Sequence, residues 1–184
     1  MTTIIGIAGS LRTGSLNAAL LRAAAQLMPD GAQLEIASIK GIPLYDGDLE
    51  AAEGIPAPVA ALKDRIAAAD GLLLATPEYN NSIPGVFKNA VDWLSRPPAD
   101  IPRVFHGRPV AVIGASPGGF GTILAQNAWL PVLHTLGTWP WSGSRLMVSR
   151  AGAVFDAAGE LTDEKIKGQL RQFLQGFVEF TQLR

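Results

Sequence analysis

Residues 6–17 read Gly6-Ile7-Ala8-Gly9-Ser10-Leu11-Arg12-Thr13-Gly14-Ser15-Leu16-Asn17. They follow a short apolar run and lead into a helical pattern, which predicts a strand, a loop of small residues and a helix. A helix that begins just after a strand presents free backbone N–H groups and the positive end of its dipole, which favours an anion. Hydroxyl groups of Ser10, Thr13 and Ser15 and the guanidinium of Arg12 add further donors. The stretch therefore predicts an anion site.

Two phosphate-binding motifs do not match this stretch. A P-loop has lysine and then serine or threonine after its second glycine, where this chain has Ser15 and Leu16 after Gly14. The dinucleotide fingerprint needs Gly-x-Gly-x-x-Gly and an acidic residue about 20 residues further on, which Gly6 and Gly9 do not begin. A hydroxyl-rich loop for a phosphate monoester remains, beside the alternative of a tight turn that binds no ligand.

Composition narrows the class of protein. With 184 residues, 48% of them hydrophobic and 17% charged, we expect a single domain over residues 1–184 with a sizeable core. A formal net charge of −1 gives no electrostatic footprint, so neither nucleic acid nor a membrane is an expected partner. The absence of cysteine excludes disulfides and thiolate chemistry, and the isolated His106 and His134 predict no metal site.

The chain also lacks signals for export or membrane insertion. The first predicted strand begins too early to leave room for a signal peptide. No apolar run approaches the length of a membrane span. We therefore expect a cytoplasmic protein.

Hydrophobic periodicity predicts strands and helices in alternation. Strands are predicted at 3–8, 33–39, 71–75, 109–115 and near 144–148, and helices at 16–27, 59–69, 84–94, 123–136 and around 166–180. Residues 41–58 are predicted to form a long surface loop. This alternation is typical of the α/β class, and we predict a flavodoxin-like doubly wound sheet of five parallel strands in the order 2-1-3-4-5, with helices on both faces.

Loops rich in glycine, proline and hydroxyl groups follow the first, third and fourth predicted strands. In that strand order the three loops are neighbours, at the switch point where such sheets bind ligands. Residues 9–17 offer the anion site, residues 77–80 a rigid Pro-Glu-Tyr-Asn ledge, and residues 116–122 a glycine-rich surface that a flat ligand can approach. FMN, a phosphate joined to a planar ring by a linker, matches this arrangement.

Two motifs and their separation carry a family resemblance. The first is Gly9-Ser10-Leu11-Arg12 with Ser15 and Asn17; the second is Pro77-Glu78-Tyr79-Asn80 with Ser82, Pro84-Gly85 and Lys88-Asn89-Ala90, continued by Asp92-Trp93-Leu94-Ser95-Arg96-Pro97. Together they resemble the NADPH-dependent FMN reductase family, which includes bacterial quinone, chromate and azo-dye reductases. The resemblance covers nearly the whole chain. Phe87, where the family pattern leads us to expect leucine, is a departure that alters packing.

The resemblance implies a set of FMN-binding residues: Ser10, Leu11, Arg12, Thr13, Gly14, Ser15, Leu16, Asn17, Pro77, Glu78, Tyr79, Asn80, Ser116 and Gly118. Within this set, Ser10, Arg12, Ser15 and Asn17 would hold the phosphate and its approach. Residues 77–80 would line the ribityl chain and the ring, and Ser116 with the glycines that follow would border the ring. No catalytic acid or base is expected, because the flavin itself exchanges hydride with the nicotinamide.

The implied function is that of an NAD(P)H-dependent FMN reductase or quinone reductase, with NADPH or NADH as donor. Its partner would be a small-molecule acceptor such as a quinone, an azo compound, chromate or free flavin, and the resemblance implies a homodimer or homotetramer. Two alternatives stay open: a flavodoxin-like electron carrier, and a reductase that supplies reduced FMN to a monooxygenase. The net charge of −1 argues against a carrier, which is expected to be strongly acidic.

Several single residues allow two interpretations. Glu78 either orients its loop or a subunit contact, or faces solvent. Tyr45 either reaches a neighbouring active site or packs within its own loop. Trp93 and the Trp139-Pro140-Trp141 segment belong either to the core or to a subunit interface.

Overall fold

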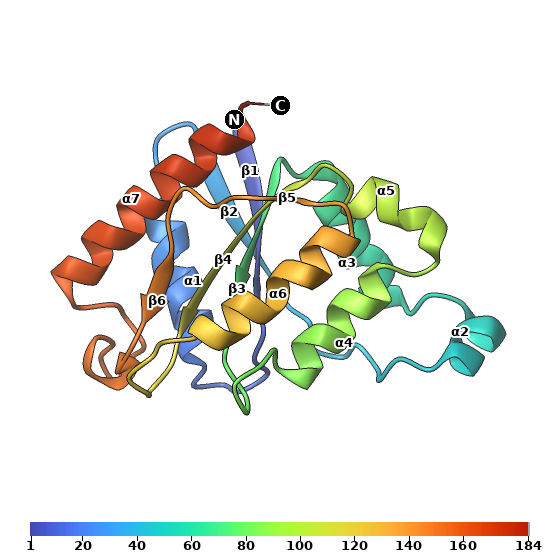
Figure 1. The fold of residues 1–184 in the computed structure, drawn as a ribbon, viewed down its shortest axis with the longest axis horizontal. Helices are drawn as coiled ribbons and strands as arrows, with labels where there is room; N and C mark the ends of the chain where they lie inside the picture. Colours follow the sequence, from blue (N-terminus) through green and yellow to red (C-terminus); the bar gives the residue numbers. More distant parts are fainter. Residues whose placement is uncertain (184) are drawn as a thin grey trace.

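A parallel sheet runs through the middle of the molecule, with helices on both of its faces (Figure 1). This computed structural model describes residues 1–183. The strands are β1 (Thr2–Ala8), β2 (Ala32–Ala37), β3 (Gly71–Ala75), β4 (Pro109–Ala115), β5 (Trp139–Pro140) and β6 (Leu146–Val148). All neighbouring strands pair in parallel, in the order β2-β1-β3-β4-β5, and β6 also pairs with β4. The predicted doubly wound order is confirmed.

Two short strands fill the fifth position of the sheet, where we predicted one strand near residues 144–148. β5 pairs with Pro109 and Val110, and β6 pairs with the last three residues of β4. Residues 141–145 separate them. The break follows from the sequence, since Pro140 has no backbone N–H to donate and Gly143 favours no strand.

The helices cover the two faces of the sheet unequally. Their bounds are α1 (Leu16–Gln26), α2 (Gly47–Glu53), α3 (Ala57–Ala68), α4 (Gly85–Leu94), α5 (Ile101–Val104), α6 (Ile123–Thr135) and α7 (Glu164–Thr181), with single 3-10 turns at Pro98–Asp100 and Ala151–Ala153. Helices α1 and α7 pack on one face, and α3, α4 and α6 on the other. β1 contributes to both cores, because Ile4 faces the first set and Ile5 and Ile7 the second. Apolar side chains on both faces are typical of central parallel strands.

Tryptophan side chains lie mainly in these two cores. Trp93 and Trp129 are fully buried. The Trp141 ring lies 4.7 Å from that of Phe173 and at right angles to it, and Trp139 contacts Phe180 with 4.2 Å between ring centres. The Trp139–Trp141 segment therefore packs against α7 within its own chain.

Helix α2 lies within residues 41–58, which we predicted as a loop. Asp46 caps it by accepting a hydrogen bond from Asp48 N at 2.8 Å. No residue of α2 is buried, so it shows no apolar periodicity in the sequence. Helix α2 therefore needs anchors outside its own backbone.

Glu50 and Tyr45 anchor this segment to the rest of the domain. The Glu50 carboxylate accepts from Arg96 Nε at 2.8 Å and from the Tyr45 hydroxyl at 3.0 Å. The Tyr45 ring packs edge-on against Trp93, with 5.0 Å between centres. Tyr45 is thus a packed aromatic of its own loop in this structure.

Acid is expected to release α2 before the core unfolds. The hydrogen bond from Arg96, and then that from Tyr45, lower the pKa of Glu50 below its ordinary value of 4.5. A lowered pKa means that the stabilisation is complete above pH 4.5 and is lost as the pH falls through the folded-state value. Hydrogen exchange over residues 47–53, corrected for intrinsic rates, should lose protection in that range. Protection that does not change as the pH falls, or an identical profile in Glu50→Gln, would contradict this role.

Candidate functional site

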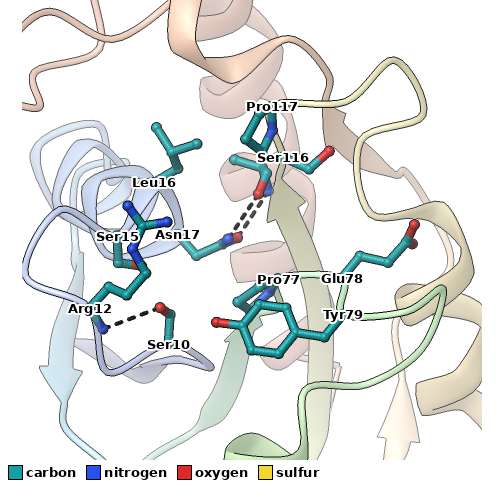
Figure 2. Close-up of a pocket in the computed structure, with 11 residues that line it drawn as sticks. Ser10, Arg12, Ser15, Leu16, Asn17, Pro77, Glu78, Tyr79, Ser116 and Pro117 are labelled. Atoms are coloured by element: carbon teal, nitrogen blue, oxygen red, sulfur yellow. Dashed lines mark hydrogen bonds between the residues drawn. The ribbon is translucent and has the colours of Figure 1, made fainter.

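A pocket lies where β1, β3 and β4 end, as Figure 2 shows. Its walls come from the loops that follow these three strands. The lining residues are Ser10, Arg12, Ser15, Leu16, Asn17, Pro77, Glu78, Tyr79, Ala115, Ser116 and Pro117. This is the switch point of the doubly wound sheet, at the carboxyl ends of the strands.

The first loop presents donors in front of α1. Ser15 is the N-cap of that helix, and its Oγ accepts a hydrogen bond from Ala18 N at 3.2 Å. The N–H of Ser15 in turn donates to the Arg12 carbonyl at 3.2 Å, which turns the chain back toward the pocket. The Arg12 guanidinium is exposed and has no acceptor among the described residues. A cation, hydroxyl groups and the positive end of a helix dipole therefore meet here.

Phe87 of α4 packs directly against this loop. A Cβ on Gly9 would lie 2.1 Å from the Phe87 ring, so the backbone of the loop rests directly on the phenyl group. The ring is fully buried and packs edge-on against Trp129, with 4.9 Å between centres. Phe87 and Gly9 are thus a matched pair, because only glycine leaves room for this ring.

Asn17 joins two of the three loops. Its Nδ2 donates to the Ala115 carbonyl at 2.9 Å and its Oδ1 accepts from Ala115 N at 2.9 Å. The side chain is buried, and Figure 2 shows both bonds as dashed lines. This pair of bonds fixes the start of α1 against the end of β4. Asn17 lines the pocket chiefly as a brace between the two loops.

The second loop folds back on itself between Tyr79 and Ser82. The N–H of Tyr79 donates to the Ser82 carbonyl at 3.1 Å, and the reciprocal bond is 3.0 Å long. Asn80 and Asn81, between them, have φ values of 49° and 61°, a left-handed conformation that asparagine tolerates better than most residues. The turn leaves the Tyr79 ring 44% exposed at the pocket wall.

Glu78 ties the second loop to α6. Its Oε2 accepts from Leu124 N at 2.8 Å and from Ala125 N at 2.9 Å, two N–H groups in the first turn of that helix. Thr122, the N-cap residue of α6, makes no side-chain capping bond. Of the two interpretations of Glu78, the structure shows that the carboxylate orients its loop.

Loss of the Glu78 carboxylate should destabilise the domain measurably. Glu78→Ala leaves two N–H groups of α6 without a protein acceptor, and the loss of a cap costs about 1 kcal/mol of unfolding free energy. Glu78→Gln keeps an acceptor oxygen and should lose less. Urea denaturation of both variants measures the difference. Wild-type stability in Glu78→Ala would contradict the capping role.

The third loop is pinned at three points. The Ser116 hydroxyl donates to the Gly121 carbonyl, Arg150 N donates to the Gly118 carbonyl at 2.8 Å, and Ala151 N donates to the Ser116 carbonyl at 2.9 Å. Gly119 and Phe120 remain at the tip between these anchors. The Phe120 side chain is 81% exposed. The loop that contributes Ser116 and Pro117 to the pocket thus also carries an exposed aromatic ring.

The pocket brings together part of the predicted site. Leu11, Thr13, Gly14, Asn80 and Gly118 are not among its lining residues. Thr13 and Gly14 line a neighbouring hollow, Asn80 forms the turn of the second loop, and Gly118 holds the third loop through its carbonyl. Ala115 and Pro117 do line the pocket and were not predicted; the signal available for them was their place at the end of a strand and in a glycine-rich loop.

Over residues 1–183, no three acidic or histidine side chains gather as a metal site would require. No helix of that part of the chain is long and apolar enough to cross a membrane.

Comparison with known proteins places the chain in a family. Residues 2–153 match the family model described as NADPH-dependent FMN reductase. The chain belongs to the NADPH-dependent FMN reductase family. Members of this family are enzymes that combine FMN with a reduced nicotinamide donor.

Individual relatives and a solved structure agree with this family assignment. An NAD(P)H-dependent FMN reductase of Pseudomonas aeruginosa is 47% identical over 94% of this chain and 91% of its own length. A quinone reductase of Escherichia coli is 37% identical over 97% of this chain and 95% of its own. Among solved structures, FerB, a flavoenzyme NAD(P)H:(acceptor) oxidoreductase of Paracoccus denitrificans, aligns with a TM-score of 0.87 at 37% identity, covering 99% of this chain and 98% of FerB.

Proposed function

We propose that residues 1–184 form one FMN-binding domain that passes reducing equivalents from NADPH or NADH to a small-molecule acceptor, in the first place a quinone. FMN, when bound, accepts a hydride from the nicotinamide and passes electrons to a second substrate in the same site. The name quinone reductase, carried by several relatives, favours a quinone over an azo compound, chromate or free flavin.

One observation carries this proposal: the Arg12 guanidinium, in the loop just before α1, lines a pocket whose other walls include Pro77, Tyr79 and Pro117. Within the described residues no carboxylate pairs with Arg12, so a phosphate group would be its partner. Ser10 and Ser15 add hydroxyl groups beside it. The donor set therefore fits the phosphate of FMN.

The planar part of FMN would lie between the second and third loops. Pro77 and Tyr79 form one wall, and Ser116 and Pro117 the other. We assign residues 10–17, 77–80, 116 and 118 to the cofactor site. No side chain is assigned as acid or base, because the protein's part is to bind, orient and leave one ring face open.

Association of copies belongs to the same proposal. An apolar hollow of about 430 Å³ between α4 and α6, lined in part by Val91, Val132 and Leu136, is the surface where two or four copies would meet. We expect the assembly, a homodimer or homotetramer, to be cytoplasmic. Light scattering after gel filtration measures the number of chains. A monomer at micromolar concentration would contradict it.

An absorbance spectrum tests the function directly. The purified protein is incubated with FMN, desalted and mixed with NADPH without oxygen. We expect a flavin spectrum that bleaches within seconds. Bound flavin that NADPH does not bleach would indicate an electron carrier, and flavin lost on desalting would indicate a reductase that supplies reduced FMN to a monooxygenase. A folded protein that binds no flavin would overturn the proposal.

Phe120 is expected to affect the acceptor more than the cofactor. Its exposed ring stands at the tip of the third loop, where a planar acceptor above the flavin could stack on it. Phe120→Ala should raise the KM for an aromatic quinone about fivefold, from the ~1 kcal/mol typical of an aromatic pair, and leave the KM for ferricyanide unchanged. An unchanged KM for the quinone, or the same fold-change in the KM values of both acceptors, would exclude this role.

A further inference from the structure

A second hollow lies directly beside the cofactor pocket, on the other side of the start of α1. It has a volume of about 410 Å³. One wall is formed by Thr13, Gly14 and α1, and the other by residues 152–159, which connect β6 to α7 (Figure 1). The two hollows share Ser15 and Leu16. A ligand can therefore extend from one into the other without leaving the protein surface.

Arg22 gives this hollow its charge. Among the described lining residues, Arg22 is the one with a positive charge. Its guanidinium has no hydrogen-bond acceptor or ion-pair partner within residues 1–183. A Cβ on Gly159 would lie 2.8 Å from Arg22 Nη2, so the guanidinium lies close against the backbone of the opposite wall. Thr13 and Gly14 line the hollow on the same side as Arg22.

The acidic residue of the hollow, Asp156, forms no ion pair with Arg22 among the described residues. Asp156 Oδ1 accepts hydrogen bonds from Ala158 N and from Glu160 N, both at 2.9 Å. Its carboxylate thus closes its own turn between Phe155 and Leu161. Phe155 and Ala19 add an apolar surface to the same hollow. An unpaired guanidinium, a hydroxyl group and an apolar wall suit a phosphate monoester attached to a flat base.

We propose that this hollow binds the adenosine 2′-phosphate end of NADPH, and that Arg22 makes the enzyme prefer NADPH to NADH. The inference rests on the proposed function, since it assigns the far end of the donor whose nicotinamide would lie at the flavin. FMN carries a phosphate monoester too. Arg12 lines the cofactor pocket and Arg22 does not, which favours Arg12 for FMN and Arg22 for the second phosphate.

Binding of a donor fragment tests the site without turnover. Titration calorimetry of the FMN-loaded protein compares adenosine 2′,5′-bisphosphate with adenosine 5′-monophosphate, which lacks the 2′-phosphate. Arg22→Ala should weaken the bisphosphate about tenfold, the low end for a hydrogen bond to a charged group because the side chain is exposed, and leave the monophosphate unchanged. Arg22→Lys should recover part of the loss. Arg171→Ala, at an exposed arginine of α7, is the matched control and should change neither ligand.

Steady-state kinetics gives an independent readout. The KM for NADPH should rise about tenfold in Arg22→Ala, while the KM for NADH and both kcat values stay at wild type. Equal effects on the two donors, or no effect on the bisphosphate, would overturn the proposal. Weaker FMN binding in the same variant would also overturn it, because Arg22 would then serve the cofactor. If the protein binds no flavin, titration of the flavin-free protein with the bisphosphate still decides the inference, so the two failures can be told apart.

Discussion

Gly114→Ala is expected to lower the free energy of unfolding by about 3 kcal/mol, the upper part of the usual range for overpacking. A Cβ at this position would lie 1.8 Å from Thr122 Oγ1 and 2.5 Å from the Thr76 carbonyl oxygen. Thr76 and Thr122 are fully buried, and the Thr76 contact is with backbone, so neither neighbour has room to move. Urea denaturation of the variant measures the loss.

The same substitution should also weaken FMN binding. Gly114 is the second-last residue of β4, and Thr122 ends the loop that begins two residues later. Displacing Thr122 shifts that loop relative to Thr76 and the second loop. Gly119→Ala is the matched control, because a Cβ there meets no atom within 4 Å and should change stability by less than about 0.5 kcal/mol. Wild-type stability in Gly114→Ala would show that the close approach of these three segments is not required.

Arg12→Ala should weaken FMN by about 2 kcal/mol, or roughly 30-fold, while the fold stays intact. The guanidinium is exposed and unpaired within the described residues, so its removal leaves no buried group unsatisfied. The loss would therefore be a loss of ligand contact. Quenching of flavin fluorescence during titration with the protein measures the affinity.

A conservative variant separates charge from geometry in this test. Arg12→Lys keeps the positive charge and loses the forked pair of donors, so its affinity should fall between those of the wild type and Arg12→Ala. Arg171→Ala again serves as the control for removing an exposed arginine. FMN affinity that is unchanged in Arg12→Ala would exclude Arg12 as the phosphate ligand.

Most of the sheet could be predicted because its strands are buried on both faces. Residues 71–75 are all buried, and such a strand appears in the sequence as a continuous apolar run between polar segments. Helix α2 could not be predicted in this way, because it buries no side chain and is held by Glu50 and Arg96, which lie 46 residues apart in the sequence. β5 has two residues, one of them proline, and so has no periodicity to detect.

For the candidate site, too, the general location could be predicted from the sequence, and the roles of individual residues could not. The three loops could be placed together from strand order alone, because they follow neighbouring strands. The roles of individual residues depend on contacts between residues far apart in the sequence. Asn17 forms a hydrogen bond with Ala115, 98 residues away, and Glu78 with Leu124, 46 residues away. Both residues were recognised as part of the site from the motif. Only the structure shows that each of them braces one loop against another element.

The divided fifth position of the sheet also bears on how copies of the chain can meet. β5 and β6 are two and three residues long, separated by residues 141–145, with Pro140 in β5. An exposed strand edge invites pairing with a strand of another molecule, and short strands and proline discourage it. This margin therefore offers no continuous row of backbone groups for a foreign strand. Self-recognition on this side of the molecule would therefore proceed through side chains, which removes one route to fibrous assembly.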